Sequence, residues 1–356
     1  MEDFMRPFRL AFVGVDHPHG AGWRELLPAL HDEIELTATV PRFGGSLTSL
    51  EERYAHLPRF GTVQELVAAD VCDGAIVCLP NSEASAAVAT LAKSGRHVLL
   101  EKPGAASAID FEPAAEAIRE KGVAFQSGYM WRYDAGAERL KAMLAEKRFG
   151  QLISIEAGLF TSDVARRGSG HYLFDPAQSR RGFFNWLACH WFDLLLFLID
   201  EPIVAVTARV GRFGATPVEV EDGGAAILEL AGGALVTFTG GYWLPRWTGE
   251  SRWTIRGSQR WVHWEPSKPG TGGAFAIHGP QPQFIAMEET FTLPPDSTPG
   301  YGGARSHRLI RDWLHDARTG ERTCRNTVES ALATLQLLDA IYEASDAGRR
   351  IVANPR

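Results

Sequence analysis

Short apolar segments alternate strictly with helix-like segments from residue 8 to about residue 127, and this alternation restricts the fold more than any other feature of the chain. The predicted strands cover residues 9–15, 34–40, 73–79, 97–100 and 123–127. The predicted helices cover residues 21–31, 63–69, 82–94 and 109–120. Strands that alternate with helices form a parallel, doubly wound sheet with helices on both faces. We therefore expect an α/β domain over residues 1–127.

The pattern changes after Gly128, where strands begin to follow one another directly. Predicted strands lie at residues 152–159, 203–210, 225–230 and 234–239, and predicted helices at 138–146, 184–199, 307–317 and 327–347. Gly232 and Gly233 mark a hairpin between the last two strands. Residues 266–275 and 295–303 are predicted to be loops, because they are rich in glycine and proline. Residues 128–356 are thus predicted to form an α+β domain with a mostly antiparallel open sheet.

The composition is that of a globular protein with about two domains. Of the 356 residues, 45% are hydrophobic and 22% are charged, and a chain of this length normally exceeds a single core. The net charge of −7 gives no electrostatic footprint for nucleic acid or for an anionic membrane. Four widely spaced cysteines predict buried thiols in a reducing compartment. We expect a cytoplasmic protein with no membrane-spanning segment.

Residues 97–103, His-Val-Leu-Leu-Glu-Lys-Pro, end a buried strand in a charged pair. Because α/β proteins bind ligands at the carboxyl ends of their strands, we expect Lys102 to lie at the ligand edge. A lysine there can donate a proton, act as an electrostatic clamp or form a Schiff base. Pro103 fixes the turn, and the peptide bond before it is a candidate for the cis form. A solvated lysine before a helix-starting proline is the alternative.

The first strand-to-helix turn contains Gly14, Asp16, His17, His19 and Gly20. In a dinucleotide-binding domain this turn holds the pyrophosphate on backbone N–H groups, usually with a Gly-x-Gly-x-x-Gly pattern. Asp16 replaces the second glycine, and its carboxylate would repel a pyrophosphate unless it turns away. The two histidines would suit a phosphate or, as His-x-His, a metal ion. A polar loop stiffened by proline is the plain alternative.

The second and third strands also end in polar groups. Pro41 and Arg42 follow the second strand, where a carboxylate for the adenosine ribose is expected. Loss of that acid beside a cation favours a 2′-phosphate, so we expect NADP rather than NAD, with a solvated arginine as the alternative. Leu79, Pro80 and Asn81 close the third strand and would place an amide and a turn at the same edge.

Residues 180–193 join a glycine-containing loop to a long apolar helix. His190 and Asp193 are three residues apart and share one helical face, so Asp193 is expected to contact or orient the imidazole. A histidine with an acid partner on a buried helix is a candidate general acid or base. A histidine satisfied within the core is the alternative.

Together these segments resemble the glucose–fructose oxidoreductase / inositol dehydrogenase / MocA-type (Gfo/Idh/MocA) family of NAD(P)-dependent oxidoreductases. The resemblance covers nearly the whole chain in order, through residues 9–15, 73–81, 95–103, 128–133, 149–155, 182–193 and 201–202. Its specific part is Glu101-Lys102-Pro103 combined with His190 and Asp193 further along the chain.

The resemblance implies hydride transfer between the nicotinamide and a hydroxyl or keto carbon of a sugar, cyclitol or related polyol. It implies a Rossmann dinucleotide-binding domain over residues 1–127 and a substrate-binding and oligomerisation domain over 128–356, in a homodimer or homotetramer. His190 would take the hydroxyl proton, and Lys102 would stabilise the developing alkoxide. The implied cofactor contacts are Gly14, Asp16, His17, His19, Gly20, Arg42, Leu79, Pro80, Asn81, Glu101 and Pro103. The implied substrate contacts are Trp131, Arg132, Asn185, Trp186 and Asp193.

Three positions depart from the family pattern. Asp16 lies in the glycine turn, Ala84 replaces a histidine that commonly follows Pro-Asn, and Trp186, beside Asn185, replaces an acid four residues before His190. Three alternatives to the dehydrogenase therefore stay open: a catalytically silent sensor on the same fold, a lyase or hydrolase that uses NAD transiently, and a metal hydrolase built on residues 16–19. Retention of Lys102 and His190 favours the dehydrogenase.

Overall fold

In the computed structural model of the protein, the described residues are 6–17, 20–44, 56–214, 217–245, 248–266, 272–279 and 287–353. The chain forms two compact units. The first contains Met1–Met130 and Ser297–Leu332, and the second contains Trp131–Asp296 and Ala333–Arg356. Each unit has its own sheet.

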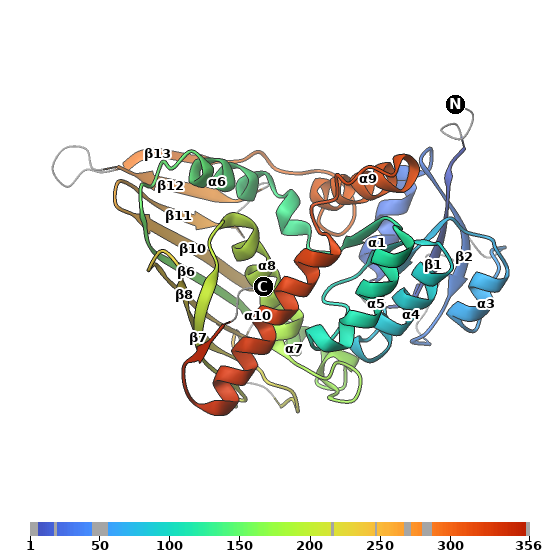
Figure 1. Cartoon of the computed structure of the whole chain (residues 1–356), viewed down its shortest axis with the longest axis horizontal. Helices are drawn as coiled ribbons and strands as arrows, with labels where there is room; N and C mark the ends of the chain where they lie inside the picture. Colours follow the sequence, from blue (N-terminus) through green and yellow to red (C-terminus); the bar gives the residue numbers. More distant parts are fainter. Residues whose placement is uncertain are drawn as a thin grey trace. The chain divides into compact units, whose positions relative to one another are not determined.

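The first unit contains a five-stranded sheet in which every pair of neighbouring strands is parallel. Two of these strands are labelled in Figure 1. Its order is β2-β1-β3-β4-β5, with β1 at Phe8–Val13, β2 at Ile34–Val40, β3 at Gly74–Val77, β4 at His97–Leu100 and β5 at Phe125–Ser127. Its helices are α1 (Gly20–Leu26), the 3-10 turn η2 (Leu27–Leu30), α3 (Val63–Ala68), α4 (Asn81–Lys93), α5 (Ala108–Lys121) and α9 (Ala304–Thr319). The predicted doubly wound α/β domain is confirmed.

The first unit also takes up a segment from late in the chain, which differs from the expected single boundary after residue 127. Helix α9 packs against β4 and β5, and Gln126 Nε2 donates to the Leu309 carbonyl at 2.8 Å. Asn326 Nδ2 donates to the carbonyls of Ser127 and Tyr129 at 2.8 and 3.0 Å. Because β5 is an edge strand, its polar groups need such partners. Residues Ser297–Leu332 supply them.

The second unit contains a nine-stranded sheet of order β13-β12-β11-β10-β6-β9-β8-β7-β14. All neighbours are antiparallel except β6 and β9, which are parallel. The strands are β6 (Leu152–Thr161), β7 (Ile203–Gly211), β8 (Gly223–Leu230), β9 (Leu235–Gly241), β10 (Gly249–Gly257), β11 (Trp261–Glu265), β12 (Ala274–His278), β13 (Met287–Thr292) and β14 (Ile351–Val352). The hairpin at Gly232 and Gly233 is confirmed, since Gly233 N–H donates to the Leu230 carbonyl. Strands β10 to β13 were not expected.

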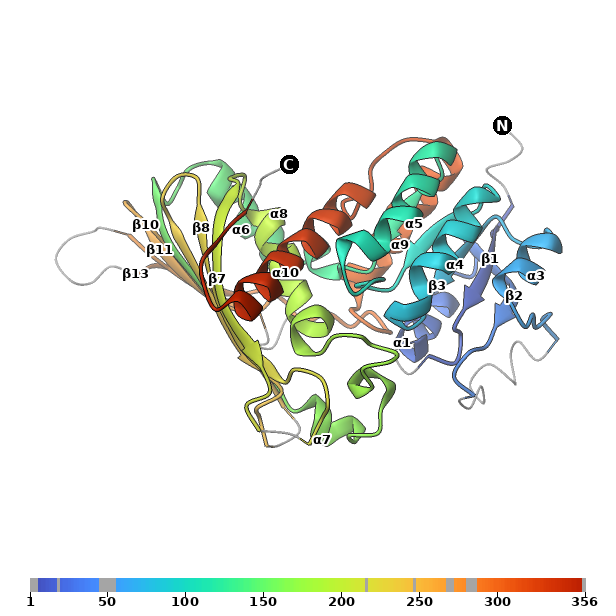
Figure 2. The ribbon, with the colours of Figure 1, turned by 60° about the horizontal axis from the view of Figure 1, so that its bottom comes forward.

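The helices of the second unit include α6 (Ala135–Ala145), α7 (Asp163–Arg167) and α8 (Cys189–Leu198), and α10 (Val328–Ala347) begins in the first unit and continues into the second. Figure 2 shows α8 on one face of the nine-stranded sheet. The predicted helix at 184–199 is divided: a π-helical turn, η5 (Phe184–Ala188), leads into α8. Glu221 accepts the N–H groups of Gly182 and Phe184 and the hydroxyl of Tyr342. These bonds fix the entry to the helix that carries His190, and π turns of this kind are frequent at functional sites.

Candidate active site

Lys102 is buried at the carboxyl end of β4, with only 1% of its surface exposed. Its Nζ lies 3.8 Å from Oε1 of Glu101, and Trp23 Nε1 donates to Glu101 Oε2 at 2.6 Å. Burial raises the pKa of Glu101, while Lys102 and Trp23 act in the opposite direction. The Lys102–Pro103 peptide bond is cis, as the sequence suggested. The alternative of a solvated lysine is therefore excluded, because a buried ammonium with a carboxylate partner is held in place.

The first turn closes tightly on the end of β3. Gly14 has φ +71°, and a Cβ on it would overlap the carbonyl oxygen of Cys78. Its N–H donates to the Val40 carbonyl at 2.7 Å, at the end of β2. Gly14 thus joins the carboxyl ends of three parallel strands, which is where a dinucleotide crosses a Rossmann sheet. Only glycine combines this backbone conformation with this contact.

The carboxylate of Asp16 turns away from the glycine turn toward the end of β2. Oδ1 accepts the Arg42 N–H and Oδ2 accepts the Phe43 N–H, both at 2.7 Å, and the residue is buried. The acid that the sequence lacks after β2 is thus supplied by the preceding turn. The carboxylate lies at the corner where the adenosine ribose of a dinucleotide binds in this fold. The expected repulsion between Asp16 and a bound pyrophosphate therefore does not apply.

Arg42 is engaged by a second acid. Its Nε and Nη2 donate to the two carboxylate oxygens of Glu83 at 2.7 and 2.5 Å, and the side chains are 42% and 37% exposed. Arg42, expected to face a 2′-phosphate or to be solvated, thus forms a bidentate ion pair between the end of β2 and the first turn of α4.

The remaining predicted cofactor residues of the first unit have varied positions. His17 is buried, with its ring edge-on to Phe43 at 5.0 Å, whereas His19 lies outside the described residues. Gly20 begins α1. Leu79 is half-buried, while Pro80 and Asn81 are buried at the start of α4.

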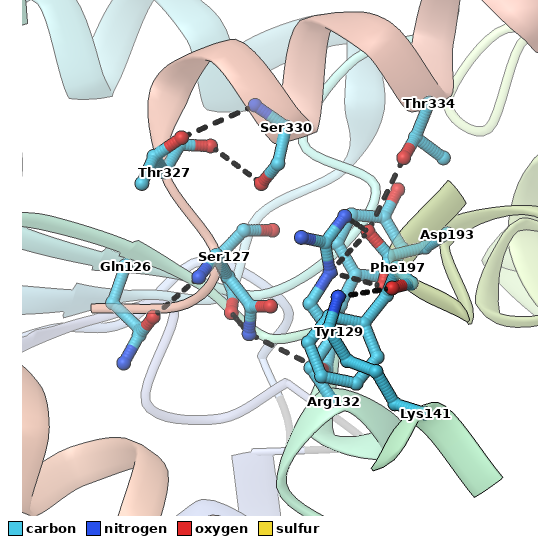
Figure 3. Close-up of polar contacts among 11 residues, drawn as sticks. Gln126, Ser127, Tyr129, Arg132, Lys141, Asp193, Phe197, Thr327, Ser330 and Thr334 are labelled. Carbon is cyan, nitrogen blue, oxygen red and sulfur yellow. Dashed lines mark hydrogen bonds and ion pairs between the residues drawn. The ribbon is translucent and has the colours of Figure 1, made fainter. Parts of the chain in front are cut away.

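In the second unit, His190 lies in the first turn of α8 and is 5% exposed. Asp193, expected to orient it, is fully buried and bound elsewhere. Arg132 donates to its carboxylate through Nε at 2.9 Å and Nη2 at 2.8 Å, and Thr334 Oγ1 donates at 3.2 Å (Figure 3). Burial raises the pKa of Asp193, and Arg132 and Thr334 oppose that shift. The pairing of Asp193 with His190 is thus corrected: Arg132 and Asp193, both expected at the substrate, bind each other.

An aromatic cluster surrounds this helix. Trp131 contacts Trp191 and Trp264 edge-on, with centroids 5.1 and 6.5 Å apart, and Trp253 lies 6.3 Å from Trp191. Trp186 is buried, with its ring edge-on to Tyr172. The side chain of Asn185 is also buried.

Three buried polar tips of the second unit stand out, and no sequence pattern indicates them: two lie in this cluster, and the third, that of Tyr242, lies beside Phe174 and Phe183. Within the described part of the chain, the indole N–H groups of Trp191 and Trp253 and the hydroxyl of Tyr242 are buried without a hydrogen-bond partner. Apolar faces combined with such donors suit a molecule that carries both carbon faces and hydroxyl groups. Only their burial, invisible in sequence, distinguishes these residues from ordinary core aromatics.

Two further features bear on function. Among the described residues, no group of three or more histidine, cysteine, aspartate or glutamate side chains is arranged to hold a metal ion. No helix in the described ranges has the length and apolarity needed to cross a membrane.

The Rossmann sheet, its glycine turn and the buried lysine define a dinucleotide-binding oxidoreductase with a second α+β unit. Residues 8–129 match the family model described as an oxidoreductase family with an NAD-binding Rossmann fold. Residues 137–263 match the model of the GFO/IDH/MocA C-terminal domain. The chain belongs to the GFO/IDH/MocA family of oxidoreductases, as its motifs predicted.

Named relatives match between about half and nearly all of the chain. D-xylose 1-dehydrogenase (NADP(+)) 2 of Haloferax volcanii is 22% identical over 95% of this chain and 98% of its own length. Inositol 2-dehydrogenase 1 of Saccharopolyspora erythraea is 27% identical over 46% of each chain. The structure of levoglucosan dehydrogenase in complex with NADH superposes with a TM-score of 0.86, at 14% identity, over 99% of this chain and all of the other. This structural likeness concerns the fold.

Proposed function

We propose that the protein is an NAD(P)-dependent dehydrogenase or reductase that acts on a hydroxyl or keto carbon of a sugar, cyclitol or related polyol. The observation that carries the proposal is the buried Glu101–Lys102 pair at the end of β4, in a family whose first domain binds NAD. The names of the xylose and inositol dehydrogenases support the same class of substrate.

The proposed roles follow from the chemistry of the side chains. The nicotinamide, when bound, exchanges a hydride with the substrate carbon. Lys102 would hold a cation at the substrate oxygen as negative charge develops there, and its burial removes the water that would weaken this effect. His190 would exchange the hydroxyl proton, which suits an imidazole near neutral pH. The buried indole donors of Trp191 and Trp253, in the aromatic cluster around the helix that carries His190, would bind substrate hydroxyl groups.

Paired substitutions test these roles. Lys102→Met preserves side-chain length and removes the charge, and His190→Asn removes the base. Each should lower kcat/KM on a polyol substrate by about a thousandfold, with NADH affinity within about threefold by fluorescence titration. If both groups serve one reaction, the double variant should be little worse than the poorer single variant.

The exposed Lys121, at the end of α5, provides the control. Lys121→Met should have full activity. Undiminished turnover in Lys102→Met would refute the assignment, and failure of the native protein to bind either NADH or NADPH would refute the redox function itself.

We also propose that the protein is a cytoplasmic homodimer or homotetramer. All four cysteines are free and buried, which fits a reducing compartment. The sheet face opposite α8 exposes the apolar side chains of Ile227 and Leu235, at 44% and 47%, and an exposed apolar sheet face favours self-association. Native mass spectrometry of the purified protein would show the assembly; a monomer at micromolar concentration would contradict it.

A further inference from the structure

We propose that Glu83 is a specificity-determining residue that selects NAD over NADP by holding Arg42 in a bidentate ion pair. The inference rests on the proposed dehydrogenase function. Arg42 alone suggests a preference for NADP. The ion pair between Arg42 and Glu83 reverses that expectation.

Asp16, Arg42 and Glu83 lie at one corner of the Rossmann sheet. Asp16 accepts the N–H groups of Arg42 and Phe43, so the backbone from which Arg42 projects is fixed. Nε and Nη2 of the same arginine donate to the two carboxylate oxygens of Glu83. The planar guanidinium forms one such side-on fork with a carboxylate or a phosphate. A 2′-phosphate would have to displace Glu83 to use that edge.

The charge balance points the same way. Glu83 neutralises the charge of Arg42, and the Asp16 carboxylate also interacts electrostatically with the Arg24 guanidinium, so these paired groups offer a phosphate no net positive charge. The 2′-phosphate of NADP is itself an anion, and like charges brought together oppose binding. The ribose 2′-hydroxyl of NAD is neutral, and a second lone pair of an Asp16 oxygen can accept a hydrogen bond from it. The corner therefore favours the cofactor without the phosphate.

An alternative explanation of Glu83 is helix stabilisation, since it lies in the first turn of α4, where acidic residues are favourable. That role would affect the stability of the protein and leave the choice of cofactor unchanged. The two explanations are thus separable by binding measurements.

The experiment compares NADH and NADPH affinities, by nicotinamide fluorescence titration, in the native protein, in Glu83→Gln and in the double variant Glu83→Gln/Arg42→Met. The native protein should bind NADH more tightly. Glu83→Gln should tighten NADPH by about fivefold, since one charge beside a phosphate is removed, with NADH within about twofold. The double variant should lose that gain, because the released arginine is gone.

Glu112→Gln is the matched control. It removes the same charge from another exposed ion pair of the first unit, that with Arg119, and should leave both affinities unchanged. A Glu83→Gln variant with an unaltered NADPH-to-NADH ratio, or with weaker NADPH binding, would overturn the role of Glu83 while leaving the proposed function intact. Binding of neither cofactor to any variant would instead overturn the proposed function, and this inference with it.

Discussion

At the scale of single residues, Gly14 is the position where the first turn tolerates least change. Its φ of +71° disfavours any side chain, and an added Cβ would also overlap the Cys78 carbonyl. We expect Gly14→Ala to destabilise the first unit by about 2–4 kcal/mol and to abolish NADH binding, since the turn must shift away from β3. Chemical denaturation and NADH titration provide the two measurements.

Gly122 distinguishes the effect of a positive φ from the effect of an overlap with a neighbouring atom. It ends α5 with φ +63°, but nothing lies within 4 Å of a Cβ built on it. Gly122→Ala should therefore cost only about 1 kcal/mol and leave NADH binding intact. If both variants behaved alike, the overlap with Cys78 would have no consequence.

The sequence predicts where a residue lies in a strand or helix better than which side chain it binds. The buried strand before Glu101 was visible as an apolar run, so the location of Lys102 at a strand end followed directly. The partners of Asp16 and Asp193 lie 26 and 61 residues away along the chain. Local spacing suggests only neighbours three or four residues apart, which is why Asp193 was paired with His190 instead of Arg132.

At the scale of elements, the Arg132–Asp193 pair joins the turn at 130–133 to α8, and Thr334 adds α10. Figure 3 also shows Lys141 of α6 donating to the Phe197 carbonyl near the end of α8. We expect Asp193→Leu to lower the free energy of unfolding by about 3–5 kcal/mol, because it removes the carboxylate that the buried Arg132 guanidinium binds through two nitrogen atoms. Urea denaturation followed by tryptophan fluorescence measures this change.

The double variant Asp193→Leu/Arg132→Met provides the comparison. Since it removes both charges, it should recover much of the lost stability. A double variant less stable than Asp193→Leu alone would show that Arg132 stabilises the unit through contacts other than this carboxylate.

Some strands of the second unit could be predicted and others could not. Trp253 and Ile255 point inward from β10 while Arg252 is exposed, so an alternating pattern exists, but glycine-rich neighbours obscured it. Strand β12 starts at Ala274, inside the segment predicted as a loop. The parallel pairing of β6 with β9 joins residues about 80 apart, and no local pattern specifies it.

At the scale of the whole molecule, the chain leaves the first unit after Met130 and returns to it at Ser297. The change in pattern after residue 127 indicated the first of these crossings. The return was not predictable, because α9 resembles any amphipathic helix and the residue that secures the return, Asn326, is a single buried amide. Sequence periodicity identifies a helix but not the sheet that it covers.

Each unit also contains a histidine that is held neutral. Ala124 N–H donates to His97 Nδ1 at 2.9 Å in the first unit, and Leu173 N–H donates to His171 Nδ1 at 3.3 Å in the second. A ring nitrogen that accepts a hydrogen bond carries no proton. Burial lowers the pKa of His97, and burial together with the Arg167 charge lowers that of His171 to about 4.

Both histidines should make the protein sensitive to acid. Each histidine has a lower pKa in the folded chain than its unfolded value of about 6.5. Its contribution to stability is therefore complete above about pH 6.5 and is lost as the pH falls toward the folded pKa. We therefore expect the thermal midpoint to fall between pH 7 and pH 4.5.

His97→Asn and His171→Asn each keep an acceptor near Nδ1 without a titrating ring, so each should reduce that fall. For His171 the recovered stability should be about 1 kcal/mol at pH 4.5, allowing for partial exposure. Profiles parallel to the native one in both variants would show that other groups cause the loss.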